Sequence, residues 1–482
     1  MELKNKIISA TKWSSVTELA AKLVTPLSTM ALARLLTPDA FGILVTATML
    51  ISFAELFADA GFQKFLIQHE FESEDDKYKA TTVAFWCNLL LSLLIWGGMS
   101  LFSFPLARLV GCSGYELVIP VSGFCIPLAA LSSIQTALFK RHFDFKTLFY
   151  VRLTGVLMPL VVTIPLAIAT HSFWALIIGM IALNLSNAII LTFKSPWKPT
   201  LYYDWGVLKK MLSFSIWSMF ESISIWLTSY LDAFIVGSFL NQYYLGIYRT
   251  SINTVGQIMG IITAATTPIL YSSLSRLQNE NKEYLKLFFS FQKTVGILVI
   301  PLGVGIFLFR NLIVEILLGK QWLPAAYFLG LWGLMSSITI VLAHYSSEVY
   351  RSKGKPKLSV CVQVSHIAVL CPVVLFFVNK GFDNLCTARA LVRLELILVN
   401  FIVMYRFFKI SPLQMLANNI SALIASGGMA LFFLLLPIQS NIFCYFIYVP
   451  VCIIVYFILL SFFPGERVII KNFLNNFYRK RK

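Results

Sequence analysis

Charged residues are scarce in this sequence of 482 amino acids. Only 13% of the residues are Asp, Glu, Lys or Arg, whereas 58% are hydrophobic. A soluble domain of this length could not bury so much apolar surface, so the composition predicts an integral membrane protein. The net charge is +17, but the basic residues lie in short loops and at the C-terminal end, with no basic domain interleaved with aromatic residues. We therefore expect no nucleic-acid partner.

The sequence also lacks the motifs of nucleotide and metal chemistry. Its five histidines are not clustered, and its eight cysteines include no CxxC and no Cys/His pair at metal-ligand spacing. Neither the P-loop pattern nor HExxH occurs. No predicted loop is long enough to hold a catalytic domain. We therefore expect no cofactor, no resident metal, no catalytic residue and a protein that is not an enzyme.

Long apolar runs make up most of the chain, each near the roughly 20 residues that a helix needs to cross a bilayer. We expect an all-α polytopic membrane protein with fourteen transmembrane helices, over residues 13–35, 41–66, 80–103, 116–138, 146–169, 171–193, 210–236, 243–271, 287–309, 322–346, 357–378, 382–405, 416–437 and 440–463. The predicted organisation comprises two pseudo-symmetric six-helix lobes, two extra helices and a tail: 1–197 (helices 1–6), 198–410 (helices 7–12), 411–463 (helices 13 and 14) and 464–482.

A repeat with an offset of 204 residues supports the two lobes. Trp13-Ser14 falls on Trp217-Ser218 and Gly42-Ile43 on Gly246-Ile247 when the sequence is shifted without a gap. Both copies carry charges inside an apolar run. This pattern predicts an internal duplication of the kind found in transporters.

The placement of lysine and arginine predicts the orientation. One set of alternating loops and the C-terminal run Arg479-Lys480-Arg481-Lys482 hold most of the basic residues. By the positive-inside rule, both termini lie in the cytoplasm, which agrees with an even number of spans.

The tail 464–482 has apolar residues at helical spacing among basic ones. It is interpreted as an amphipathic segment on the inner leaflet, or alternatively as a frayed basic end.

Ionisable residues inside the spans are the candidate functional residues, because each should face protein or water rather than lipid. Arginine and lysine are the residues that bind phosphate groups, so one set is assigned to substrate binding: Lys22, Arg249, Arg152, Arg389 and Arg393. The acids assigned to ion coupling are Glu221, Asp232 and Glu18. The predicted site is a hydrated cationic cavity between the lobes. Structural alternatives remain open: Glu18 can pair with Lys22, and Arg152 and Arg389 can extend to the interface.

Two further patterns are defined by the spacing of residues along a predicted helix. Glu18, Lys22, Thr25 and Thr29 fall on one face of helix 1. Gly256 and Gly260 form a GxxxG pair in helix 8, which is interpreted as a close helix contact, with a dimer face as the alternative.

The runs LARLLTPDAFG (32–42), FAELFADAGFQKFLIQ (53–68) and DAFIVGSFLNQYYLGIY (232–248) resemble a known family. With the fourteen-span layout, they make the chain similar to Wzx-type polysaccharide flippases of the colanic-acid-exporter-like branch, in the multidrug/oligosaccharidyl-lipid/polysaccharide superfamily. The first 70 residues carry the specific likeness, and the rest of the chain matches by layout. Unlike lipid II flippases of the superfamily, this chain has no basic residue in the first half of helix 2.

The resemblance implies two facing bundles and a substrate: an oligosaccharide repeat unit on undecaprenyl diphosphate, moved across the bacterial inner membrane by alternating access for O-antigen, capsule or exopolysaccharide synthesis. By helix position, it implies that Lys22 and Arg249 contact the diphosphate. It leaves coupling to protons or sodium, and association with the polysaccharide polymerase machinery, open. Membrane lipids are the other expected partners.

Two other classes are retained as alternatives. A small-molecule or cation antiporter of the same superfamily would need an acidic rather than a basic cavity. A polytopic glycan polymerase is disfavoured by the short outer loops.

Overall fold

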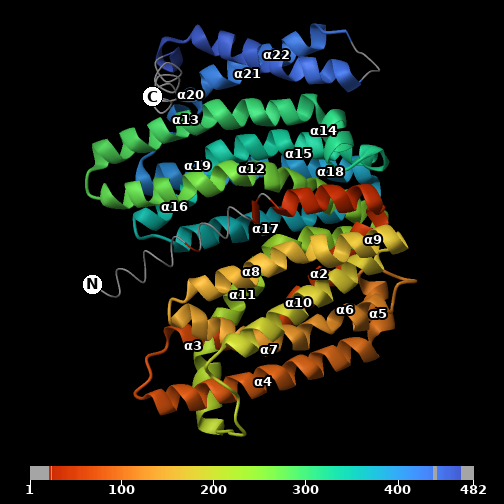
Figure 1. Ribbon diagram of the computed structural model, residues 1–482. Helices are drawn as coiled ribbons and strands as arrows, with labels where there is room; N and C mark the ends of the chain where they lie inside the picture. Colours follow the sequence, from red (N-terminus) through yellow and green to blue (C-terminus); the bar gives the residue numbers. More distant parts are fainter. Residues whose placement is uncertain (1–12, 14–20, 23, 438–441, 468–482) are drawn as a thin grey trace, which may run out of the picture. The chain divides into compact units, whose positions relative to one another are not determined.

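The computed structural model describes residues 13, 21, 22, 24–437 and 442–467, and over these residues it contains helices and no strand (Figure 1). Within this part of the chain, eleven helices are long and apolar enough to span a membrane. The predicted all-α, polytopic membrane fold is therefore confirmed. The packing of the helices divides the chain into two units, Met1–Arg249 and Thr250–Lys482.

The count of fourteen spans stays a prediction. Eleven predicted spans coincide with the eleven long apolar helices. The other three are the first, which lies partly outside the described residues; 382–405, which is broken into two shorter helices; and 416–437, which contains the 16-residue helix Ile420–Leu435.

The first unit begins with a helical segment at 24–35, followed by α2 (Pro38–Asp59), α3 (Phe62–Gln68), α4 (Glu74–Leu101), α5 (Ser103–Leu109), α6 (Val118–Gly123), α7 (Cys125–Arg141), α8 (Phe145–Met158), η1 (Pro159–Thr163), α9 (Ile164–Thr170), α10 (Trp174–Lys194) and α11 (Trp205–Phe239). The first residues of α12 (Gln242–Arg276) also belong to this unit.

Local sequence signals explain where these helices begin. Thr37 is extended, with φ −73° and ψ 161°, and Pro38 opens α2, a position where proline removes no helix hydrogen bond. Ser73 caps α4 by accepting a hydrogen bond from the Asp76 N–H at 3.1 Å. The predicted span 41–66 is two helices, because Ala60 and Gly61 adopt positive φ between α2 and α3.

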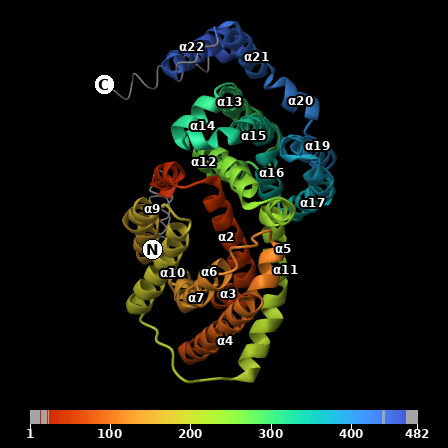
Figure 2. The same cartoon turned by 90° about the vertical axis from the view of Figure 1, so that its right-hand side faces the viewer.

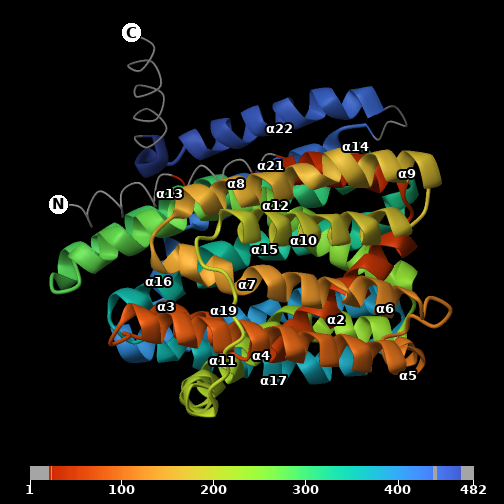
Figure 3. The ribbon, with the colours of Figure 1, turned by 60° about the horizontal axis from the view of Figure 1, so that its bottom comes forward.

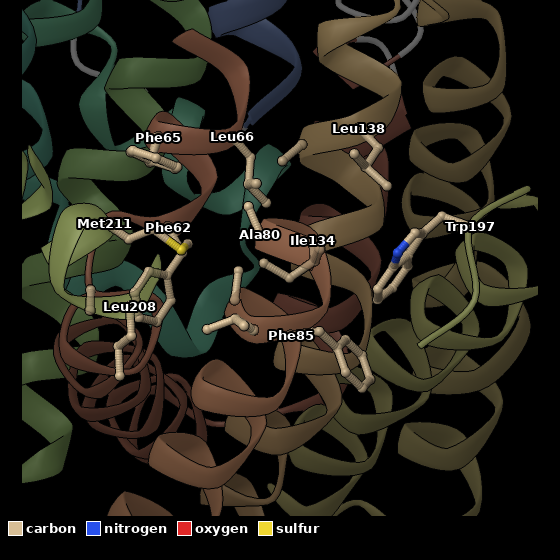
Figure 4. Packing of buried hydrophobic residues seen from close by; sticks show 14 residues of the cluster. Phe62, Phe65, Leu66, Ala80, Phe85, Ile134, Leu138, Trp197, Leu208 and Met211 are labelled. Atoms are coloured by element: carbon tan, nitrogen blue, oxygen red, sulfur yellow. The ribbon is translucent and has the colours of Figure 1, made fainter. Parts of the chain in front are cut away.

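The core of the first unit is a row of neighbouring helices. α4 packs on α7, α7 on α10, and α10 on α8, as Figure 3 shows, while α2 contacts α4, α6 and α7 (Figure 2). A buried apolar cluster joins α3, α4 and α7 to the start of α11 (Figure 4). Phe62, Val83 and Ile134 are fully buried in it. The α3 end is fixed by Arg141, whose Nη1 donates to the Leu66 and His69 carbonyls at 2.7 Å each. This packing holds the helices that line the first-unit cavity described below.

Two glycines of the repeat allow α2 and α12 to cross in backbone contact. A Cβ atom on Gly42 would lie 1.9 Å from the Gln242 carbonyl oxygen, and one on Gly246 would lie 1.9 Å from the Pro38 carbonyl oxygen. Pro38 and Gln242 are separated by the same 204 residues as Gly42 and Gly246. The contact is thus related by the repeat, which supports the predicted duplication.

The second unit contains the rest of α12 and then α13 (Asn281–Leu308), α14 (Arg310–Leu317), η2 (Lys320–Ala325), α15 (Ala326–Thr339), η3 (Ile340–His344), α16 (Ser346–Ser352), α17 (Lys357–Phe377), η4 (Val378–Lys380), α18 (Phe382–Leu391), α19 (Arg393–Phe408), α20 (Pro412–Ala417), α21 (Ile420–Leu435) and α22 (Ile442–Ser461). α21 and α22 lie side by side (Figures 1 and 3), and α21 packs on α13.

Polar contacts attach the last helices to α13. Tyr456 on α22 donates a hydrogen bond to the Ile297 carbonyl at 2.7 Å, and Lys293 lies 2.9 Å from the carboxylate of Glu466. The two appended helices therefore belong to the second unit by packing. Of the predicted tail 464–482, residues 464–467 are helical and the remainder lies outside the described residues.

The packing places α11 with the first unit, because it contacts α2, α3 and α4. The predicted lobes instead divide the chain at residues 197 and 198. The two units are groups of helices that contact one another in the structure, whereas the predicted lobes are the two copies of the sequence repeat. The lobe bounds therefore stay a prediction.

Candidate functional site

A polar cavity of about 700 Å³ lies in the first unit between the 24–35 helix, α7, α8 and α10. Its hydroxyl groups come from Thr25, Ser28, Thr29, Ser132 and Thr136, and its cations from Lys140 and Arg152. The cavity therefore offers hydroxyls that can exchange hydrogen bonds with sugar hydroxyls, and cations that can bind an anion.

The structure supports part of the predicted polar face of helix 1. Thr25 and Thr29 both line this first-unit cavity, as does the predicted substrate-binding residue Arg152, whose side chain is exposed. Lys22 is half-buried and is not among the residues that line the cavity. Glu18 lies outside the described residues.

A second cavity, of about 440 Å³, lies in the second unit between α12, α15, α17 and α19. Its polar lining includes Ser336, His344, Gln363, Asn400 and the predicted residue Arg393. In the predicted numbering of spans, helices 4, 5 and 6 border the first cavity and helices 10, 11 and 12 border the second. Three of the helices at each cavity therefore correspond in the repeat, whereas the fourth is helix 1 at the first cavity and helix 8 at the second.

The GxxxG pair lines this second cavity. A Cβ atom on Gly256 or Gly260 would have no heavy atom of another residue within 4 Å, apart from the backbone of its own helix and its neighbours in sequence. Among the described residues, no second helix comes within 4 Å of these Cβ positions, so the interpretation as a close helix contact stays a prediction. Their small size leaves space in the cavity wall.

Two predicted cations stack on one aromatic ring at this cavity. The Arg393 guanidinium lies 3.7 Å from the centroid of the Trp332 ring, and that of Arg389 lies 4.7 Å from it. Arg393 also donates to the Ser336 hydroxyl at 2.5 Å. Arg389 is only 7% exposed. The predicted span 382–405 breaks at Val392, which separates α18 with Arg389 from α19 with Arg393.

A titratable pair that was not predicted lies beside these arginines. The Nδ1 atom of His366 on α17 is 2.9 Å from the carboxylate of Glu395 on α19. Both arginines are close enough to act electrostatically on the His366 ring. His366 and Glu395 are ionisable residues within predicted spans, so the criterion that selected the other candidates would also have found them.

Arg249 and Asp232 lie where α11 meets α12. The Arg249 guanidinium is 4.8 Å from the Tyr230 ring centroid, and its Nη1 donates to the Ser229 carbonyl at 2.9 Å. Asp232 is 2% exposed and accepts hydrogen bonds from the Tyr248 hydroxyl and the Ala233 N–H, both at 2.8 Å. The side chain of Glu221 lies outside the described residues, although its backbone is part of α11.

The environment of Asp232 leads to a stability prediction. Asp232→Ala should lower the free energy of unfolding by about 1–3 kcal/mol, because it removes the buried hydrogen bond that the Tyr248 hydroxyl donates to Asp232. Asp232→Asn keeps an acceptor oxygen and should have a smaller effect. The thermal midpoint of the detergent-purified protein measures the difference, with the exposed Asp383→Ala as the control. Equal midpoints for Asp232→Ala and the unaltered protein would contradict this account.

Within the part of the chain that the structure describes, no group of three or more His, Cys, Asp or Glu side chains is arranged to hold a metal ion. The predicted substrate-binding residues do not form one cluster within either unit. The structure brings together Arg389 and Arg393, places Arg152 in the first-unit cavity, and locates Arg249 at the α11–α12 contact.

Polar, cation-bearing cavities inside spanning helices, together with an internal repeat, are typical of membrane transporters. The profile of the family described as "Polysaccharide biosynthesis protein" matches residues 31–327. That match covers more than half of the chain, and the chain belongs to this family. The predicted resemblance to polysaccharide flippases is thereby confirmed.

Individual relatives agree with the family. The chain is 24% identical to the "Uncharacterized membrane protein in cps region" of Klebsiella pneumoniae, over 78% of this chain and 77% of that protein. It is 21% identical to the "Lipopolysaccharide biosynthesis protein WzxC" of Escherichia coli strain K12, over 70% and 69%. Among solved structures, "Lipid II flippase MurJ, inward closed conformation" has a TM-score of 0.74 at 14% identity and covers 94% of this chain and 99% of that one. The similarity to the solved structure, at 14% identity, shows that the two proteins share a fold.

Proposed function

We propose that this protein is a flippase that moves oligosaccharide repeat units, linked to undecaprenyl diphosphate, across the bacterial inner membrane by alternating access. The single observation that carries the proposal is the pair of cavities inside a polysaccharide-biosynthesis fold, each lined by hydroxyls and at least one arginine. Hydroxyls suit a sugar, and arginine suits a diphosphate. The units would serve O-antigen, capsule or exopolysaccharide synthesis.

The candidate residues have separate roles in this proposal. Arg152 binds the anionic head group in the first-unit cavity and Arg393 binds it in the second-unit cavity, while Lys22, Arg249 and Arg389 contribute further positive charge. The polyprenyl chain stays in the lipid. Asp232, Glu221 and Glu18 exchange a proton or sodium ion and so change the attraction for those cations. Both termini face the cytoplasm, the chain has no catalytic role, and the polymerase machinery receives the translocated unit.

The decisive experiment is deletion of the gene in its host. Surface polysaccharide should disappear, and lipid-linked repeat units should accumulate on the cytoplasmic face, because synthesis continues while transfer stops. Reconstituted protein should also make a fluorescent polyprenyl-diphosphate oligosaccharide accessible to a quencher on the opposite side of proteoliposomes. Protein-free vesicles give the background rate.

Two other outcomes would overturn the proposal. Accumulation of single repeat units outside the inner membrane would indicate a polymerase instead. Export of a cationic dye by the proteoliposomes, without movement of the lipid-linked glycan, would indicate a small-molecule antiporter.

A further inference from the structure

Three lysines gather around a cavity at one end of the second unit. The cavity has a volume of about 370 Å³ and lies between the start of α13, the 353–356 loop and the end of α19. Lys353, Lys355 and Lys409 line it, and no Asp or Glu belongs to its lining. The cavity is separate from the polar cavity that holds Arg393, since the two share no lining residue.

Lys353 is held in place by neutral groups. Its ammonium donates to the Gln278 carbonyl at 2.6 Å and to the Asn281 side-chain oxygen at 3.0 Å, and it lies 4.4 Å from the Tyr284 ring centroid. Burial lowers the pKa of Lys353 from its ordinary value. These contacts fix the position of the charge without neutralising it.

Lys355 and Lys409 complete the arrangement. The Lys355 ammonium lies 5.6 Å and 5.7 Å from the ring centroids of Phe407 and Phe408. Lys409 follows directly and ends α19 with φ 58°. Among the described residues, no carboxylate forms a salt bridge with any of the three lysines. Within the described part of the chain, the cavity therefore concentrates positive charge without a salt-bridged counter-ion.

The surroundings indicate that the anion comes from a lipid. Phe407 borders the cavity and is 49% exposed, and Leu413, on the neighbouring short helix α20, is 77% exposed. Exposed apolar side chains next to uncompensated cations match the two chemical parts of a phospholipid, which are its acyl chains and its phosphate. A free phosphate ion would use only the lysines.

We propose that Lys353, Lys355 and Lys409 form a binding site for the phosphate of an anionic phospholipid head group, whose acyl chains pack beside Phe407 and Leu413. The site is distinct from the proposed substrate cavities and does not depend on the flippase proposal. Phosphatidylglycerol is the simplest lipid with the required single phosphate and negative charge.

The test measures phosphatidylglycerol bound to the purified full-length protein in phosphatidylcholine nanodiscs, by native mass spectrometry. Changing Lys353, Lys355 and Lys409 together to glutamine should weaken binding by about tenfold or more, because each lysine near an anionic lipid adds to its attraction. The matched control changes the exposed Lys282, Lys286 and Lys357 to glutamine, which removes the same charge outside the cavity. The control should retain most of the binding.

Three outcomes overturn the proposal: equal losses in the two triple variants, no loss in either, or displacement of the lipid by inorganic phosphate at a matched concentration. The first would indicate diffuse attraction to a basic surface, and the third a free-anion site. If the cavity triple variant does not fold, Lys355→Gln alone serves, because the contacts of this exposed side chain with other described residues are with the Phe407 and Phe408 rings. Its binding should still fall below that of Lys357→Gln, and equal binding in these two variants overturns the proposal.

Discussion

Arg393→Ala is expected to reduce surface polysaccharide by about tenfold or more, at an unchanged amount of protein in the membrane. The guanidinium lines the second-unit cavity, 3.7 Å from the Trp332 ring centroid, and donates to Ser336. A cation over tryptophan contributes about 0.5–2 kcal/mol, according to how far it is desolvated, and Arg393 is half-buried. The ring therefore helps to hold the charge in a fixed position. Loss of that charge removes the phosphate-binding group of this cavity under the proposed function.

Arg393→Lys tests whether transport needs only the positive charge at this position or also the stacking of a planar guanidinium on Trp332. Lysine keeps the positive charge but cannot stack a planar group on Trp332 while bonding Ser336. We therefore expect transport between that of Arg393→Ala and that of the unaltered protein. The same intermediate level is expected for Trp332→Leu, which removes the ring that positions the guanidinium.

The matched control is Arg406→Ala. Arg406 lies on the same helix, α19, but it is exposed and does not line the cavity. It should leave surface polysaccharide within about twofold of normal, as expected for a surface substitution. If Arg393→Ala and Arg406→Ala gave equal amounts of polysaccharide, the second-unit cavity would have no part in transport.

Much of the fold could be predicted because it depends on composition and period. A bilayer imposes helix length and apolar character on each span, and both are visible in one sequence. The break inside the predicted span 382–405 could not be predicted in the same way. No glycine or proline adjoins Val392, whereas Ala60 is followed by Gly61, a residue type that commonly ends helices.

In the candidate site, too, some features could be predicted from the sequence and others could not. Arg389 and Arg393 were predicted from their place inside an apolar run, and the structure places both on Trp332. Trp332 lies on another helix, and nothing in its own sequence context distinguishes it from any membrane tryptophan. The contact arises from packing between distant segments, which a helical period does not encode. His366 and Glu395 could have been found, because both are ionisable residues within predicted spans.

The GxxxG pair illustrates why a motif needs its structural context. Gly256 and Gly260 have the spacing of a close helix contact but border a cavity. Gly42 and Gly246 have no such spacing, yet their helices do meet in backbone contact. Only the 204-residue repeat connected these two glycines in the sequence. Their contact therefore offers a direct test of the duplicated architecture.

Gly42→Ala and Gly246→Ala are each expected to lower the free energy of unfolding by about 1–3 kcal/mol, the usual cost of overpacking. Each new Cβ would lie 1.9 Å from a backbone carbonyl oxygen, which cannot rotate away as a flexible side chain could. The helices must separate. That separation would also strain the Thr46 hydrogen bond to the Gln242 side chain, which is 2.9 Å long.

Gly97→Ala on α4 is the matched control. Among the described residues, a Cβ atom at Gly97 would meet no neighbouring helix or side chain within 4 Å. This variant should leave the thermal midpoint unchanged or raise it slightly, since alanine favours a helix over glycine by about 1 kcal/mol. A midpoint for Gly42→Ala equal to that of Gly97→Ala would show that α2 and α12 are not in backbone contact.

The double variant Gly42→Ala/Gly246→Ala tests whether the two glycines act in a single contact. One alanine already forces α2 and α12 apart, so the second should meet less resistance. The loss of stability should therefore fall short of the sum of the single losses by about 0.5–3 kcal/mol, as found for residues that share a contact. Simple additivity would mean that the two glycines act independently, and the repeat-related crossing would then not be a single structural unit.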